Sequence, residues 1–332
     1  PEQRKDKIFT LVKQLNFAID LLDTQAQKDE LAQLNLIAAQ RAKYATAYAV
    51  AANYLNAGLE ILNPPRPAGE TLESSWIRNY ELTIELYVEA VETEYLNTNF
   101  ARSHFLTAVV LHEAKTLLEK VKVYAVKIKC YFSQNQMQTA IDTGLQVLAM
   151  LECSLEQEPP SSELTVEDLA NLPEMTDASK LAALQILDAV SISAFVTNPA
   201  LYGTIVFTKV NLCIKYGNSH LAAMAYADYA ILLCGSTGGI DTGYRYGELA
   251  LQLMGKFNAK EVRCKVLNVF NTHIRPWKEP LRKTIEPLSA AVQSGIEAGD
   301  LIFMGVASIN YCTHTFFQGE PLEQLANNCE QY

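Results

Sequence analysis

Apolar residues recur three and four positions apart along most of the chain, and this spacing places them on one face of an α-helix. The pattern opens with Ile8, Leu11 and Leu15 and continues through the runs 31–37 and 44–62. Further helices are predicted over residues 80–96, 100–117, 121–133 and 137–151. The turns between these later helices are only a few residues long, which makes consecutive helices antiparallel neighbours. The pattern predicts an all-α fold.

The second half of the chain repeats with a period of 41 residues. Dipeptides that end helices recur at this spacing, namely Thr176-Asp177, Gly217-Asn218, Asn258-Ala259 and Gly299-Asp300. One column of positions in this register is aromatic in three of its four copies, which are Asp188, Tyr229, Phe270 and Tyr311. In the first half, Tyr124 and Tyr131 precede Ala140 and Gly144 with the spacing of the tetratricopeptide pattern, in which an aromatic residue packs against small residues of the next helix. We therefore predict an α-solenoid of stacked antiparallel helical hairpins, a tetratricopeptide-like superhelix.

The net charge of −10 is concentrated in one segment. Residues 152–177 contain eight acidic residues and no Lys or Arg, together with Pro159-Pro160-Ser161-Ser162 and an apolar stretch around Leu169. We expect N-terminal hairpins over 1–151, an acidic connector with a short helix over 152–178, and C-terminal hairpins over 179–332. The acidic balance argues against a nucleic-acid-binding protein, because binding to phosphates needs a concentrated basic surface.

The cysteines and the apolar runs indicate a location for the chain. The seven cysteines form no CxxC pair, and several stand inside apolar runs, where a free thiol behaves as a small hydrophobic group. We therefore expect a reducing, cytoplasmic environment. No run approaches eighteen uncharged apolar residues and the first residues are too charged for a signal peptide, so no membrane insertion is expected. A chain that begins at Pro1 and ends at Tyr332 is expected to be a fragment of a longer protein.

Motifs that mark catalysis, nucleotide binding or metal binding are missing from the sequence. It contains no GxxxxGK[ST] phosphate loop, no HExxH zinc motif and no GxSxG nucleophile turn. The one glycine-rich stretch, 234–239, is interpreted as the turn of a helical hairpin because no Lys follows it. We expect no catalytic residue, no cofactor and no metal in this segment.

The strongest surface signal is the loop 273–283, where two prolines and four cations surround one of the two tryptophans. Arg and Trp are enriched in the residues that dominate protein interfaces. The candidate partner-binding residues are His273, Arg275, Trp277, Lys278, Arg282 and Lys283. The alternative is that the tryptophan anchors the loop to the helices while the cations are solvated.

A second hypothesis is a small-ligand sensor with an effector cavity inside the solenoid. Polar residues stand within apolar helical runs of the second half, and buried polar groups need partners. The candidate cavity residues are Asn268, Asn271, His273, Asn310 and His314.

Several strings in the chain resemble the helical region of one protein family. They are Leu31-Ala32-x-Leu34-Asn35-Leu36, Trp76-x3-Tyr80-x-Leu82-Thr83, Leu169-x-Asn171-Leu172-Pro173-Glu174-Met175, Val210-Asn211-Leu212-x-Ile214-Lys215-Tyr216-Gly217-Asn218 and Asn310-Tyr311-Cys312-x-His314. The family is that of the large bacterial signalling proteins, frequent in cyanobacteria, which join a serine/threonine kinase domain, an AAA-type predicted ATPase domain, a tetratricopeptide-like helical region, a GAF domain and a histidine kinase. Two features depart from the pattern: the loop 63–75 is longer and richer in proline, and Ile128 stands where a small residue is usual.

The resemblance implies that kinase and ATPase chemistry would lie outside residues 1–332. We therefore expect a non-catalytic helical-repeat scaffold or regulatory segment of a multidomain signal-transduction kinase. Its expected partners are proteins or flanking domains of the same chain.

Overall fold

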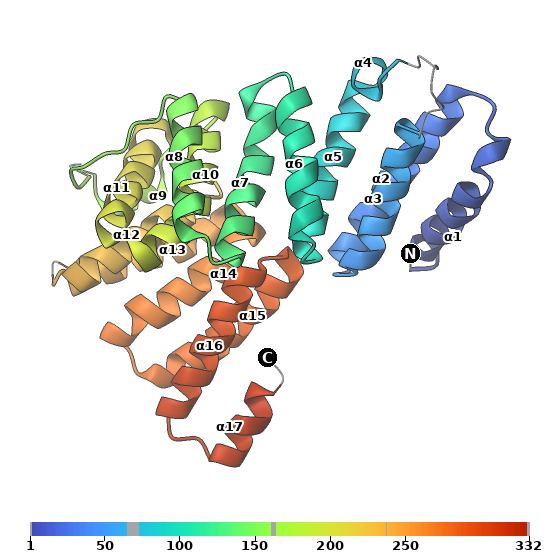
Figure 1. Ribbon diagram of the computed structural model, residues 1–332. Helices are drawn as coiled ribbons and strands as arrows, with labels where there is room; N and C mark the ends of the chain where they lie inside the picture. Colours follow the sequence, from blue (N-terminus) through green and yellow to red (C-terminus); the bar gives the residue numbers. More distant parts are fainter. Residues whose placement is uncertain (1, 65–72, 161–163, 237, 331–332) are drawn as a thin grey trace. The chain divides into compact units, whose positions relative to one another are not determined.

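The computed structural model describes residues 2–64, 73–160, 164–236 and 238–330. Within these ranges the chain is helical and contains no strand, only an isolated β-bridge between Glu174 and Asn218 (Figure 1). The predicted all-α class is confirmed. Much of the loop 63–75 and residues 161–163 of the acidic connector lie outside the described residues. The chain divides into two compact units, Pro1–Cys130 and Tyr131–Tyr332, and the division falls inside one helix.

The first unit consists of helices that pack mainly on their neighbours in sequence. Its elements are α1 (Glu2–Phe17), a 3-10 turn (Ile19–Leu21), α2 (Gln25–Tyr44), α3 (Tyr48–Leu62), α4 (Ser75–Arg78), α5 (Tyr80–Leu96), α6 (Phe100–Glu113) and most of α7 (Leu117–Ser133). Helix α2 packs on α3, α3 on α5 and α5 on α6. Small residues permit this close packing: a Cβ atom added to Gly58 of α3 would lie 3.0 Å from Leu86 of α5. Ala51, Ala52 and Gly58 of α3 are all buried, so the small residues of this helix form a helix contact surface.

The helix predicted over 100–117 ends early. Helix α6 stops at Glu113, and α7 begins at Leu117. The reason is a local capping arrangement, in which the Glu119 carboxylate accepts from the backbone N–H of Thr116 (2.7 Å) and the Thr116 hydroxyl accepts from the N–H of Glu119. This pair of hydrogen bonds starts a new helix at Leu117, so the break between the two predicted helices lies at residues 114–116 and not at residues 118–120.

The second unit contains the remaining helices. Its elements are α8 (Met137–Met150), α9 (Val166–Ala170), α10 (Ala178–Thr197), α11 (Pro199–Tyr216), α12 (Ala222–Ser236), α13 (Ile240–Lys256), α14 (Lys260–Val269), a π-helical turn (Phe270–Ile274), 3-10 turns (Arg275–Trp277 and Leu281–Thr284), α15 (Ile285–Ala298), α16 (Leu301–Phe317) and α17 (Leu322–Cys329).

The helices of the second unit pack on their neighbours in sequence. Each helix from α10 to α17 contacts the next one, and the most extensive of these contacts are α12 with α13 and α15 with α16. Alternate helices also touch, α12 with α14 and α14 with α16. Helices α10, α12, α14 and α16 each begin within five residues of the dipeptides spaced 41 apart. The cavity described below lies between α10, α12, α14 and α16, and Tyr202 of α11 also lines it.

The described part of the acidic connector packs on the second unit. Leu169 and Met175 are buried. The side-chain amide of Asn218, at the end of α11, donates to the carbonyl of Leu169 (2.7 Å), and its backbone exchanges hydrogen bonds with Pro173 and Met175. Gly217 makes this approach possible, because its φ is 101° and a Cβ there would lie 2.3 Å from the Pro173 oxygen. Residues 164–177 are thus held in place by specific hydrogen bonds.

Candidate functional site

The basic loop 275–283 follows the π-helical turn, and three of its four cations form ion pairs with acidic side chains. The Arg275 guanidinium bonds Glu279 (3.0 Å), and Lys283 bonds the same carboxylate (2.8 Å). Lys278 pairs with Asp241 of α13, and the Tyr244 hydroxyl also donates to Glu279. Hydrogen bonds from Lys283, Tyr244 and Arg275 lower the pKa of Glu279 to about 2. The loop therefore carries much less free positive charge than its sequence suggests.

Trp277 and Arg282 are the loop residues best placed to meet a partner. The Trp277 side chain is 56% exposed, and its indole N–H donates to the backbone oxygen of His273 (3.0 Å). Arg282 is exposed, and no acidic partner is recorded for it within the described residues. The hydrogen bond of Trp277 fixes the ring on the loop while one face stays accessible. An exposed, held aromatic ring and an exposed guanidinium on the same loop suit an interface anchor.

The residues predicted to line a cavity separate into two groups. Asn268 is 1% exposed, and its Oδ1 accepts from the amide of Asn310 (2.9 Å). Asn271 instead donates to the backbone oxygen of Leu267 and accepts from Arg275. His314 bonds the Thr284 hydroxyl (2.7 Å). Of the five predicted residues, Asn268 and His273 line the cavity described next, Asn310 supports Asn268 from behind, and Asn271 and His314 do not line it.

A change of helix type positions His273. Helix α14 ends at Val269 and continues as five residues of π-helix, Phe270–Ile274, before the 3-10 turn at Arg275–Trp277. A π-turn inserts one extra residue per turn and so rotates the side chains that follow it. Phe270 and Ile274 remain in the core, and the His273 ring meets the ring of Phe195 edge-on at a centroid distance of 6.0 Å. Burial, and then the nearby His314, lower the pKa of His273, so its imidazole is neutral at neutral pH.

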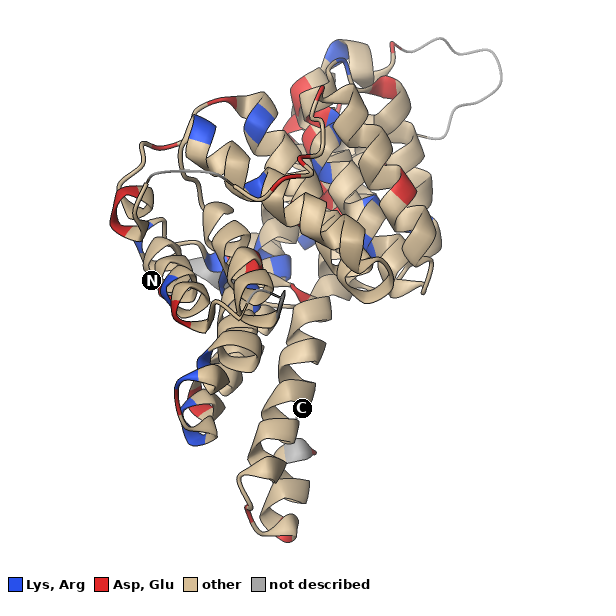
Figure 2. Ribbon diagram, turned by 90° about the vertical axis from the view of Figure 1, so that its left-hand side faces the viewer, with Lys and Arg blue, Asp and Glu red and all other residues tan. Residues whose placement is uncertain are grey.

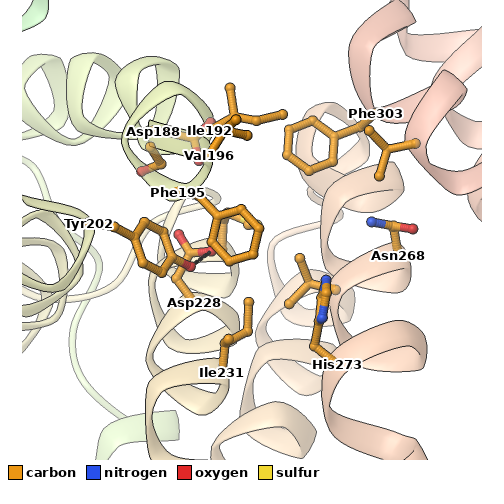
Figure 3. Close-up of a pocket in the computed structure, with 14 residues that line it drawn as sticks. Asp188, Ile192, Phe195, Val196, Tyr202, Asp228, Ile231, Asn268, His273 and Phe303 are labelled. Atoms are coloured by element: carbon orange, nitrogen blue, oxygen red, sulfur yellow. Dashed lines mark hydrogen bonds between the residues drawn. The ribbon is translucent and has the colours of Figure 1, made fainter. Parts of the chain in front are cut away.

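A cavity of about 250 Å³ opens between α10, α12, α16 and the α14 segment, by which we mean α14 and the π-helical turn that continues it to Ile274 (Figure 3). Most of its wall is apolar. The apolar lining comes from Ile192, Phe195, Val196, Met224, Ile231, Val269, Phe303 and Val306. Asn268 and His273 reach into the cavity from one side, and Tyr202 and Asp228 border it on the opposite side. Phe195 and Val196 are 43% and 59% exposed, so the cavity is reached from solvent on their side.

A buried cluster of charges forms the polar border of this cavity. Lys209 of α11 is 1% exposed and bonds Asp228 of α12 (2.7 Å) and Asp188 of α10 (3.4 Å). Lys265 of α14 bonds the second oxygen of Asp188 (2.6 Å), and the Tyr202 hydroxyl donates to Asp228 (3.0 Å). Burial would lower the pKa of Lys209, but Asp228 and Asp188 outweigh it and raise that pKa, so the amine stays charged. Two cations and two anions thus compensate one another inside the protein.

Sequence reasoning missed this cluster, although a signal was present. Asp228 is the one charged residue in α12, and Lys209 is flanked by the apolar and hydroxyl side chains of α11. A lone charge in an apolar helix must find a buried partner, because an isolated buried ion is very costly. The sequence does not show which charged residues pair with each other, because the partners are far apart in the chain. Asp188 and Lys265, for example, are 77 residues apart.

The chemistry offered by the cysteines and by candidate metal ligands is limited. Burial raises the pKa of Cys130 to about 11 and that of Cys213 and Cys264 to about 12. These thiols therefore stay protonated and behave as apolar side chains. Among the described residues, no group of three or more His, Cys, Asp or Glu side chains is arranged to hold a metal ion.

Among the helices that the structure describes, one, α10, is long and apolar enough to cross a membrane by length and composition alone. In the structure, 56% of its most apolar window is buried. It packs on α8 and α11, and Asp188 at its middle pairs with two lysines. A core helix passes the same test of length and composition, so this feature is weak evidence for a membrane span.

Comparison with known protein families finds no matching family. The chain is similar to the hybrid signal transduction histidine kinase G of Dictyostelium discoideum, with 22% identity over 358 aligned residues. The alignment includes 98% of this chain and 10% of that kinase, so the chain spans about a tenth of the length of the relative it matches. This similarity, at 22% identity, supports the expected relation to signal-transduction kinases. The expected assignment to a tetratricopeptide-like region of the bacterial family stays a prediction.

Proposed function

We propose that this chain is a non-catalytic helical-repeat segment of a larger signal-transduction kinase, where it acts as a scaffold for protein–protein or interdomain contacts. The observation that carries the proposal is the alignment, in which nearly all of the chain matches one tenth of a hybrid histidine kinase. An alignment that covers nearly all of one chain and only a tenth of the other is expected when the first corresponds to one segment of a large multidomain protein. Kinase activity would then belong to other parts of that protein.

The packing of the second unit supports a repeat architecture. Each helix from α10 to α17 packs on the next, and α14 also touches α12 and α16, as in stacked helical hairpins. We propose that these pairs form a tetratricopeptide-like solenoid. Stacked hairpins form extended surfaces, which such proteins use to bind other proteins.

Exposed apolar side chains support a role in protein contacts. Helix α16 contains no Asp, Glu, Lys or Arg, and Figure 2 shows the neutral residues in tan. Ile309, Phe316 and Phe317 are 67%, 53% and 71% exposed. Exposed apolar side chains such as these favour contacts with other proteins or domains.

The test uses the longer protein that contains this chain. We expect Trp277→Ala and Arg282→Ala each to change the autophosphorylation rate of the whole protein by several-fold while its melting temperature stays the same. Arg263→Ala, at an exposed cation of α14, is the matched control and is expected to leave the rate unchanged. If all three variants show the wild-type rate, the loop takes no part in regulation. ATP hydrolysis by the isolated chain would contradict its proposed non-catalytic role.

A further inference from the structure

We propose that the cavity between α10, α12, the α14 segment and α16 is a binding site for a small, uncharged aromatic molecule that carries one hydrogen-bond acceptor. This inference goes beyond the proposed function and does not depend on it. It rests on the size of the cavity, on the chemistry of its wall and on the hydrogen bonds of its polar residues.

Size limits the ligand to about two fused rings. An apolar protein cavity of about 150 Å³ holds a benzene molecule. The present cavity measures about 250 Å³. A bicyclic molecule of about ten non-hydrogen atoms fits this space, whereas a nucleotide or a peptide does not.

The wall of the cavity favours a flat aromatic molecule. The rings of Phe195 and Phe303 both face the space, as Figure 3 shows. Met224, 3% exposed, adds a thioether, which makes favourable contacts with aromatic rings. Two facing rings and a flexible sulfur atom suit a planar ligand better than a branched aliphatic one.

Charge in the ligand is disfavoured because the carboxylates at the border already have counter-ions. Asp228 is held by Lys209 and Tyr202, and Asp188 by Lys209 and Lys265. A cationic ligand would compete with buried ammonium groups, and an anionic ligand would meet two carboxylates. An uncharged molecule avoids both penalties.

Asn268 provides the polar contact. Its Oδ1 accepts from the amide of Asn310 (2.9 Å) and from the Thr272 hydroxyl (3.5 Å), which leaves the amide nitrogen outside these two contacts. In Figure 3 this nitrogen points toward the cavity, and no protein acceptor is recorded for it within the described residues. An N–H donor that faces the cavity favours a ligand that brings an acceptor.

Quinoline and naphthalene test the proposal, because they share a bicyclic shape and only quinoline carries an acceptor nitrogen. We expect quinoline to bind the 332-residue chain with a dissociation constant below about 1 mM. Naphthalene is expected to bind about three- to tenfold more weakly, the loss that accompanies one neutral hydrogen bond. Isothermal titration measures both affinities.

Methyl NMR locates the bound probe in the native chain, and a variant is needed only to assign one signal. With the methionine methyl groups labelled with ¹³C, quinoline is expected to shift the resonance of Met224 and to leave that of Met150, outside the cavity, unchanged. A Met224→Leu variant assigns the signal. If Met224 does not shift at quinoline concentrations up to about 5 mM, well above the expected dissociation constant, the proposal is overturned.

Two variants test the geometry. Val306→Phe fills the cavity and is expected to abolish quinoline binding, whereas Ile309→Phe, on the exposed side of the same helix, is expected to leave it unchanged. Asn268→Leu is expected to weaken quinoline binding to the level of naphthalene. Wild-type affinity in a folded Val306→Phe variant, or equal affinity of the native chain for the two probes, would overturn the site or its polar contact respectively.

Discussion

Lys209 and Asp228 form an ion pair inside the second unit, with Nζ and Oδ2 2.7 Å apart and side chains that are 1% and 3% exposed. The pair joins α11 to α12, and Asp188 links it to Lys265 of α14. Four helices of the unit therefore meet at one compensated set of charges. The same cluster borders the proposed ligand cavity, so its integrity bears on both stability and binding.

Removal of one member of this pair is expected to be strongly destabilising. Lys209→Met should lower the free energy of unfolding by about 3–5 kcal/mol, because it leaves Asp228 buried without its counter-ion. The double variant Lys209→Met, Asp228→Asn should recover at least half of that loss, since the asparagine is uncharged and still accepts from Tyr202. Chemical denaturation measures each value. Lys215→Met, at an exposed position of the same helix, is the control, and an equal loss there would contradict the special role of Lys209.

Gly217 is expected to tolerate no side chain. Gly217→Ala should destabilise the protein by about 2–4 kcal/mol, because its φ of 101° disfavours alanine and the new Cβ would lie 2.3 Å from the Pro173 oxygen. Amide hydrogen exchange should show lost protection at Met175, which donates to the Asn218 oxygen, and at Asn218, which donates to the Pro173 oxygen. Gly255→Ala provides the comparison, since no atom lies within 4 Å of its added Cβ and alanine favours the helix. Equal stability of the two variants would show that the φ of Gly217 and its close approach to Pro173 do not exclude a side chain there.

Glu92 is expected to make the first unit sensitive to acid. Burial would raise its pKa, but Lys122 and Lys43 outweigh burial and lower it from 4.5 to about 2. A carboxyl group with a lowered pKa in the folded state contributes stability above about pH 4.5, and this contribution is lost as the pH falls toward 2.

Thermal unfolding between pH 7 and pH 2 measures this contribution. Glu92→Gln should lower stability at pH 7 by roughly 1–2 kcal/mol, after allowance for solvent screening. Its stability should also change less than that of the wild type as the pH falls from 5 toward 2. Glu81→Gln, at an exposed position of the same helix, should retain the wild-type pH dependence. Parallel curves for wild type and Glu92→Gln would show that the ion pairs do not form.

Glu279 is expected to hold the basic loop in its conformation. Glu279→Ala removes the acceptor shared by Arg275, Lys283 and Tyr244, so amide exchange over residues 275–283 should become faster. The rest of the second unit should keep its protection. Glu286→Ala, an exposed acid in the first turn of α15, should leave the loop unchanged. Unaltered exchange of the loop in Glu279→Ala would mean that Trp277 alone anchors it.

Local pattern predicted the helices but not their boundaries in every case. The predicted helix 80–96 matches α5, because its apolar period and its flanking turns agree. The helix predicted over 100–117 ends at Glu113, because the Thr116 and Glu119 capping interaction starts α7. The sequence carried this signal as Thr-x-x-Glu, but apolar periodicity alone does not reveal it.

The candidate site was predicted in part. The lone polar residues Asn268 and His273 were expected at a cavity because buried polar groups need partners, and both line one. The basic loop was found from its charges, but its neutralisation by Glu279 and Asp241 was not, since Asp241 lies on a different helix.

The sequence by itself determined that the chain is helical and where helices end at intervals of 41 residues in its second half. Both features depend on residues that are close together in the chain. Only the tertiary structure decided which charges neutralise one another, where the cavity lies and which polar atom faces it. Those features join residues tens of positions apart, such as Asp188 and Lys265. Their energies depend on burial and distance, which exist only after the helices have packed.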